Sequence, residues 1–160
     1  MKRILVSILC VSLLAVSALG QGNQFQFRYV GGSISSTVKP DDWHNDITVT
    51  SEQITLKFKD GQEIKIDPKM VKSITHGHHA SRRIGAYAAA AIISPIFLLG
   101  MLKKNKRNFV GIEYETSDGK KQGVNLQIKN EKYKALLTAL SGVTGVKVEE
   151  EADESKNKKK

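Results

Sequence analysis

The sequence has a single cysteine among its 160 residues, and this scarcity excludes several kinds of chemistry. Cys10 lies in an N-terminal segment that we expect to be removed, so the mature chain would have no disulfide, thiolate metal ligand or cysteine nucleophile. The sequence also lacks a phosphate-binding P-loop, a G-x-S-x-G nucleophile motif and a dinucleotide-binding fingerprint. These absences predict a protein that is not an enzyme and that needs no cofactor.

Residues 1–20 have the composition of an export signal. Lys2 and Arg3 precede an apolar run, and Ala18, Leu19 and Gly20 provide the small-residue end of a cleavage site. We therefore predict an exported protein of the cell envelope. An uncleaved anchor helix is the alternative interpretation of the same residues.

The remaining length fits one domain with terminal additions. We expect an N-terminal strand and loop over residues 21–45 and a β-rich domain over residues 46–148. In the loop, Asp41 and Asp42 next to Pro40 are expected to be turn or cap residues, and Trp43 to anchor the loop to the body. The tail, residues 149–160, is rich in lysine and glutamate and too polar to pack against a core. An apolar insert at residues 84–102 divides the β-rich domain.

Alternating apolar and polar residues predict a series of short strands, each with one buried face. Asp60-Gly61 and Asp118-Gly119 each separate two such runs, and glycine there favours tight hairpin turns. The apolar positions of the predicted strands are Phe25, Phe27, Tyr29, Ile47, Val49, Ile54, Leu56, Phe58, Ile64, Ile66, Val71, Ile74, Val110, Ile112, Tyr114, Val124, Leu126 and Ile128. The pattern indicates antiparallel strands before and after the insert.

One amphipathic helix is predicted near the C-terminus. Tyr133, Leu136, Leu137 and Leu140 have the i, i+3, i+4, i+7 spacing of a single apolar stripe. We expect Asn130 to cap the start of this helix. Gly142 is the expected stop, and a short edge strand follows near Val148.

Three pieces of sequence resemble the bacterial pleckstrin-homology-like group: I-T-L-K-F-K-D-G-Q-E-I-K-I-D-P, the K-S-I that follows it, and the helix E-K-Y-K-A-L-L-T-A-L. The resemblance covers about residues 46–148 without the insert. It implies a small, partly open barrel closed by its last helix, which binds lipid headgroups or protein segments and has no catalytic role. The apolar insert is not part of that basic domain, and no phosphoinositide-binding motif aligns with the first hairpin.

The predicted fold class is therefore α+β: a small antiparallel, partly open barrel or curved sheet, capped by a C-terminal helix and interrupted by an apolar helical hairpin or transmembrane segment. Residues 84–102 contain no charged side chain and would span roughly 28 Å as a helix. Three interpretations remain open: a single membrane span, a hairpin turning at Pro95, and a hairpin buried in a soluble protein. A single span would separate the two groups of strands, which favours a hairpin if they share one sheet.

Basic residues flank the insert without any acid among them, and they contribute most of the excess behind the net charge of +9. We expect these flanks and parts of the insert to contact a membrane, with anionic lipid as a partner and a protein partner as a second possibility. Nucleic acid is not expected, because the aromatic residues are not interleaved with the basic cluster. The predicted membrane-contact residues are Arg82, Arg83, Tyr87, Ile92, Pro95, Phe97, Lys103, Lys104, Lys106 and Arg107.

His76, His78 and His79 form the one cluster with a candidate chemical role. In an extended segment, His76 and His78 would point to the same face and could share a metal ion. A third ligand is not evident in the sequence, so we predict no metal site. A metal-binding protein or enzyme centred on these histidines is the alternative function, and a soluble exported binding domain is a further alternative.

Overall fold

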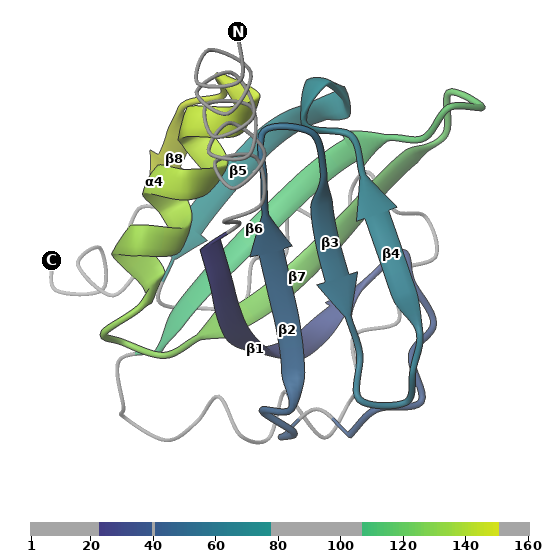
Figure 1. Cartoon of the computed structure of the whole chain (residues 1–160), viewed down its shortest axis with the longest axis vertical. Helices are drawn as coiled ribbons and strands as arrows, with labels where there is room; N and C mark the ends of the chain where they lie inside the picture. The colour runs from purple at the N-terminus through teal and green to yellow at the C-terminus, as the bar shows by residue number, and fades with distance from the viewer. Residues whose placement is uncertain (1–22, 40, 78–106, 151–160) are drawn as a thin grey trace, which may run out of the picture.

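The computed structural model describes residues 23–39, 41–77 and 107–150 (Figure 1). Eight strands form one sheet in the order β4-β3-β2-β1-β7-β6-β5-β8. The elements are β1 (Asn23–Gly32), β2 (Asn45–Val49), β3 (Ile54–Lys57), β4 (Glu63–Ile66), the 3-10 helix η2 (Pro68–Met70), β5 (Val71–Gly77), β6 (Asn108–Glu115), β7 (Lys121–Ile128), α4 (Tyr133–Thr144) and β8 (Val148–Glu150).

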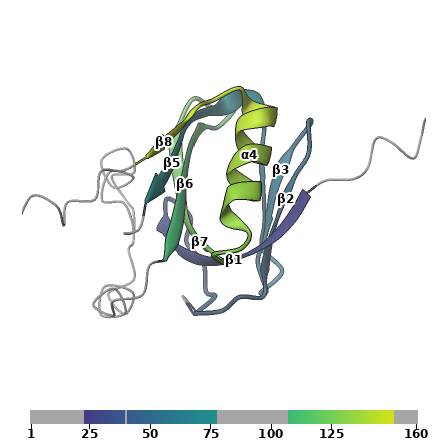
Figure 2. The same ribbon diagram turned by 90° about the vertical axis from the view of Figure 1, so that its left-hand side faces the viewer.

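Neighbouring strands are antiparallel except for β5 and β8, which are parallel. The sheet curves strongly, and α4 lies on its concave side between the wall of β2 and β3 and the wall of β5 and β6 (Figure 2). Leu136 and Leu140 of α4 are fully buried there. We call the side that faces α4 the inner face and the opposite side the outer face.

The inner face carries the hydrophobic core. Alternate residues of the strands point to it, as the period of two requires. Phe58 packs edge-on against both Phe27 and Tyr29, with ring centroids 5.6 and 5.4 Å apart. These contacts connect β1 to Phe58, which follows β3, so the core continues from β1 across β2 to the end of β3.

His76 joins the helix to the sheet. Its ring is stacked on that of Tyr133, with centroids 4.9 Å apart and planes 10° from parallel. Its Nε2 atom lies 3.2 Å from Oδ1 of Asn108, whose amide donates to Oδ1 of Asn130 over 2.7 Å. Through these contacts, Asn130 connects the segment before α4 to β6. The expected helix cap at Asn130 is therefore wrong, and α4 begins after Lys132 with no side-chain cap.

The C-terminal end of α4 also differs from the prediction. Gly142 lies inside the helix, and the left-handed residue that ends it is Gly145, with φ of 71°. The Gly145 N–H donates to the carbonyl oxygen of Ser141. Glycine at this position avoids the steric cost of a positive φ.

The predicted fold class is corrected by the structure. Its description included an interrupting apolar helical hairpin or transmembrane segment, whereas the described structure is dominated by one sheet with one α-helix, α4. No helix in the described ranges is both long and apolar enough to span a membrane, so the transmembrane prediction is corrected with it. Residues 84–102 themselves lie outside the described residues.

Strand pairing gives the physical reason for rejecting a single span. β5 precedes the insert and β6 follows it, yet the two strands pair along their length, with Gly77 opposite Phe109. The described strands nearest to the insert on either side therefore lie beside each other in one sheet. A single membrane span would place the strands before and after it on opposite sides of the bilayer, where β5 and β6 could not pair.

We predict that Leu140→Ala lowers the free energy of unfolding by about 2–5 kcal/mol, because it leaves a cavity between α4 and the sheet. Urea unfolding followed by circular dichroism measures the change. Thr138→Ala is the matched control on the exposed side of α4 and should change stability by less than about 0.5 kcal/mol. Equal losses for the two variants would contradict the placement of α4.

Two glycines provide a second, paired prediction. Gly32 has φ of 149°, and a Cβ atom there would meet the carbonyl oxygen of Gly123 at 2.2 Å. Gly32→Ala should therefore cost about 1–3 kcal/mol. Gly142 lies in α4, and a Cβ atom added to it would meet no neighbouring atom within 4 Å, so Gly142→Ala should stabilise by about 0.5–1 kcal/mol. Thermal unfolding that ranks the two variants in the reverse order would contradict the register of β1 and β7.

Candidate functional site

Cationic side chains and the tryptophan meet at one end of the outer face. Arg28 lies between the core residues Phe27 and Tyr29 of β1 and therefore points outward. Asn108 pairs with Ile128, so Arg107, just before Asn108, and Lys129, just after Ile128, come from the same end of β6 and β7. We call Arg28, Trp43, Arg107 and Lys129 the basic corner.

Trp43 comes to the basic corner from the loop between β1 and β2. The guanidinium carbon of Arg28 lies 4.5 Å from the centroid of its ring, and the Lys129 ammonium lies 5.5 Å from it. Both distances are within the range of cation–π attraction. The prediction that Trp43 anchors its loop to the body of the domain is confirmed by these contacts.

The charges around Arg28 act on its guanidinium. Burial lowers the pKa of Arg28 from its usual value, and the nearby positive charge of Arg107 lowers it further. The carboxylates of Asp41 and Asp42 oppose this shift. Arginine still stays protonated near neutral pH, so the guanidinium remains a cation beside a second cation.

Polar atoms on the outer face lack hydrogen-bond partners within the described structure. They are Nε of Arg28, Oε1 of Gln127 and Oδ1 of Asn125, all of them buried. Arg28 and Gln127 are register partners on β1 and β7. Buried polar groups are normally hydrogen-bonded, so this part of the face has unused binding capacity.

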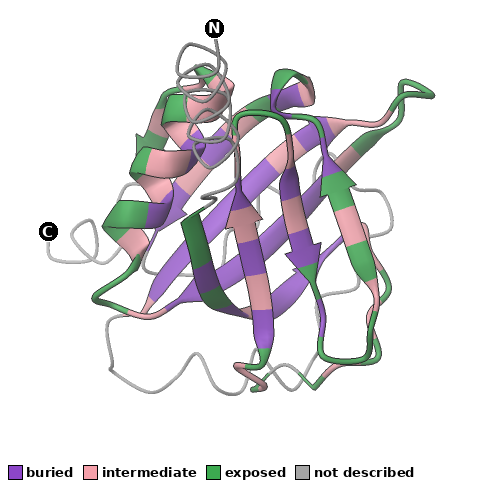
Figure 3. Ribbon diagram, viewed as in Figure 1, coloured by how far each residue is buried: buried purple, intermediate pink, exposed green. Residues whose placement is uncertain are grey.

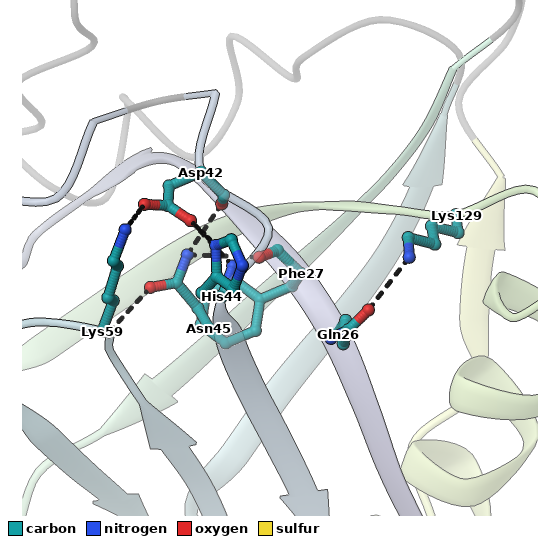
Figure 4. Close-up of polar contacts among 7 residues, drawn as sticks. All are labelled: Gln26, Phe27, Asp42, His44, Asn45, Lys59 and Lys129. Atoms are coloured by element: carbon teal, nitrogen blue, oxygen red, sulfur yellow. Dashed lines mark hydrogen bonds and ion pairs between the residues drawn. The ribbon is translucent and has the colours of Figure 1, made fainter.

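The loop beside the basic corner is held by a separate polar network (Figure 4). Asp42 accepts hydrogen bonds from Nζ of Lys59 at 2.8 Å and from the backbone N–H of His44 at 2.9 Å, and its Oδ1 also lies 2.6 Å from Nδ1 of His44. The buried Asn45 amide donates to the carbonyl oxygens of Phe27 and Asp42 and accepts from the Lys59 N–H. The network fixes the chain on either side of Trp43. It confirms the interpretation of Asp42 as a turn residue.

Lys129 connects the basic corner to a polar side chain on the outer face of β1. Its ammonium donates to Oε1 of Gln26 over 2.9 Å (Figure 4). Gln26 in turn is opposite Asp46 on β2. The basic corner is therefore continuous with the exposed polar outer face of the β2–β4 wall.

The predicted site residues fall in different places. Arg107 is described and belongs to the basic corner. Arg82, Arg83, Tyr87, Ile92, Pro95, Phe97, Lys103, Lys104 and Lys106 lie outside the described residues. The predicted membrane contacts at these positions therefore have no structural support.

The histidine cluster is also only partly described. His76 is 7% exposed and points to the inner face, where Tyr133 and Asn108 occupy its surroundings. His78 and His79 lie outside the described residues. Within the described ranges, no group of three histidine, cysteine, aspartate or glutamate side chains could hold a metal ion.

The basic corner was not predicted as a site. The sequence indicates roles for Arg107 and Trp43 separately, but Arg28 and Lys129 belong to no motif. Their proximity depends on the pairing of β1 with β7 and of β7 with β6, which brings together residues far apart in the chain. One indication of the basic corner was present in the sequence: Arg28 lies on the polar face of a strand whose other face is aromatic.

No protein-family model and no curated protein matches this chain. Among solved structures, a chain in the structure of the Spt16D Pob3N heterodimer is similar, with 13% sequence identity and a TM-score of 0.48. The match covers 83% of this chain and 56% of that one, so this chain spans little more than half of its length. A similarity at this level carries no functional conclusion.

The described fold is compatible with the pleckstrin-homology-like resemblance, since a curved antiparallel sheet holds a C-terminal helix on its concave side. The bacterial assignment and the membrane insertion gain no support from the described residues. The correction concerns the transmembrane segment, and membrane association through the flanks of residues 84–102 stays a prediction. The signal peptide falls on residues outside the described ranges.

We predict that the Asp42 carboxyl has a pKa well below its usual range, because Lys59 and then His44 hydrogen-bond to its charged form. Its folded-state pKa lies below the unfolded-state value of about 3.9, so its contribution to stability is present above that pH and is lost as the pH falls. Carbon-detected NMR titration measures the pKa. Lys59→Gln should raise it, whereas the control Lys65→Gln, which removes an ion pair to Glu63, should leave it unchanged. An Asp42 pKa insensitive to Lys59→Gln would contradict the network.

Proposed function

We propose that this chain is a non-enzymatic interaction domain that binds an acidic segment of a protein partner at the basic corner. The observation that carries the proposal is the half-buried guanidinium of Arg28, which lies 4.5 Å from the Trp43 ring and beside the positive charge of Arg107, and whose Nε donates to no acceptor in the described structure. A donor of this kind binds best to a charged acceptor. Carboxylates accept from arginine through two parallel hydrogen bonds.

The position of the guanidinium favours a planar acceptor. The cation–π contact with Trp43, 4.5 Å from the guanidinium carbon to the ring centroid, restrains the Arg28 side chain, which reduces the entropy lost on binding. Arg107 and Lys129 add positive charge at the same end of β6 and β7. An aspartate or glutamate side chain of a partner would therefore meet one fixed fork and two neighbouring cations.

The aromatic residue adds contact area. Trp43 is neither fully buried nor fully exposed, so its ring can contact a partner while remaining anchored by its cationic neighbours. Tryptophan and arginine are among the residue types most enriched at the positions that dominate binding energy in protein interfaces. An acidic segment with an apolar side chain next to its carboxylate fits this combination.

Export and a cell-envelope location remain predictions, because they depend on residues 1–20. Binding at the basic corner requires neither of them. The absence of catalytic motifs in the sequence is the reason for proposing a binding role.

Trp43 is the only tryptophan of the chain, so its fluorescence reports on the basic corner directly. Titration of the purified protein with a glutamate-rich peptide should give a saturable change in Trp43 emission. Because exposed charges are screened by salt, the Kd should rise on the order of tenfold between low-salt buffer and buffer with several hundred millimolar NaCl. A lysine-rich peptide of the same length should give no saturable change.

Variants locate the binding. Arg28→Gln should weaken binding by about tenfold or more, since a hydrogen bond to a charged group contributes about 1.5–3 kcal/mol. Lys129→Gln should weaken it less, and the charge-matched control Lys147→Gln, on the exposed chain after α4, should leave the Kd unchanged. Far-ultraviolet circular dichroism verifies that each variant is folded. The proposal fails if Lys147→Gln weakens binding as much as Arg28→Gln, or if only anionic vesicles or a DNA oligonucleotide change the emission.

A further inference from the structure

The two halves of the sheet differ in burial. β2 alternates between buried and half-buried residues, as expected for a strand with one covered face. In β6 and β7, runs of consecutive residues are buried on both faces, which Figure 3 shows as nearly continuous purple strands. Such continuous burial is typical of strands that are covered on both sides.

The side chains on the outer face of this half do not belong to the core. Val30 and Phe109 are each 3% exposed, yet neither is part of the hydrophobic core cluster. Asn125 and Gln127 are 5% and 6% exposed, and they alternate with core residues of β7. We call Val30, Phe109, Asn125 and Gln127 the outer patch.

Strand register makes the outer patch continuous. Gln127 lies opposite Phe109 on β6 and opposite Arg28 on β1. Asn125 lies opposite Gly111 on one side and Gly31 on the other. The glycines leave the Asn125 side chain with small neighbours, so a covering segment can approach closely at this point.

The described helix that packs on the sheet cannot cover the outer patch. α4 lies on the inner face, where Leu136 and Leu140 join the core cluster (Figure 2). Trp43 covers Arg28 at one end of the face, but its contacts are with the basic corner. The outer patch is therefore buried by something other than the helix.

The connection between β5 and β6 has the position and the length to cover it. Gly77 and Phe109 are paired, so residues 78–106 leave and rejoin the sheet at one end of neighbouring strands. Two antiparallel neighbours need a connection of only about 2–5 residues, and the excess must be accommodated elsewhere. Phe109 of the outer patch belongs to the strand on which this connection ends.

The composition of the connection matches the outer patch. Residues 84–102 carry no charge and are mostly apolar, so packing on Val30 and Phe109 removes apolar surface from water on both sides. Their backbone N–H groups and the hydroxyls of Ser94 and Tyr87 are donors of the kind that the unpaired oxygens of Asn125 and Gln127 require. A charged cover would lose its hydration here without an opposite charge in the outer patch.

We infer that residues 84–102 dock on the outer patch of their own chain and form a second, smaller core on the outer face of β1, β7 and β6. The docking leaves the basic corner, at the end of the same face, available to a partner. It does not depend on the proposed binding of an acidic segment, and either proposal can fail without the other.

Photo-crosslinking in the intact chain tests the inference. Benzoylphenylalanine is incorporated in place of Val30 in one variant and of Gln127 in another, and the purified protein is irradiated without detergent or lipid. Residues 84–102 contain no lysine or arginine, so trypsin releases them as one peptide ending at Lys103. Both variants should lose most of this free peptide and give its adduct with the peptide that contains the probe, while the protein still migrates as a monomer.

The matched control carries the probe in place of Thr55, on the outer face of β3, and should keep the free peptide. Adducts between two chains that increase with protein concentration would show a second copy on the outer patch and overturn the inference. So would adducts confined to peptides of the strands, or equal loss of the free peptide in the Thr55 control. If the probe at Val30 prevents folding, the more peripheral Gln127 position decides the result.

Discussion

The sheet depends on β1, because this strand pairs with β2 along one edge and with β7 along the other. It joins the N-terminal hairpins to the β5–β7 group and so turns two series of strands into one curved layer. The register shifts between Tyr29 and Gly31, where glycines with positive φ let the strand follow the curve. The curvature creates the concave space that α4 fills.

The two faces of the sheet have different roles as a result. The inner face is a continuous apolar core, with the His76–Tyr133 stack tying α4 to β5. The outer face changes along the sheet from an exposed polar wall on β2–β4 to a buried half on β6 and β7. The basic corner lies at the end of this buried half, and burial lowers the pKa of Arg28 there.

Local patterns predicted much of the secondary structure. The turns at Asp60-Gly61 and Asp118-Gly119 are confirmed, with φ of 90° and 76° at the two glycines, and the stripe at Leu136 and Leu140 is buried as expected. The ends of α4 were mispredicted because Asn130 is engaged by Asn108 and because Gly145, not Gly142, adopts the left-handed conformation. Composition alone does not distinguish an apolar segment that contacts lipid from one that packs against protein, so it left the interpretation of residues 84–102 open.

The site was less predictable because it is made by register. Arg28, Arg107 and Lys129 meet only after β1, β7 and β6 are aligned, and no local pattern fixes that alignment. The burial of Asn125 and Gln127 was equally invisible, since polar residues alternating with apolar ones predict a solvent-exposed face. The structure instead shows polar side chains that are buried and carry oxygens without hydrogen-bond partners among the described residues.

The central claim is that the strands on either side of the apolar segment form one sheet that is complete without a membrane. Amide hydrogen exchange of Val110 and Leu126, paired on β6 and β7, tests it most directly in the full chain in aqueous buffer without detergent or lipid. The account predicts that the Val110 and Leu126 amides exchange as slowly as the amide of Ile47 in β2, at the rate set by global unfolding. Rapid exchange of the β6 and β7 amides that becomes slow only when lipid or detergent is added would contradict it.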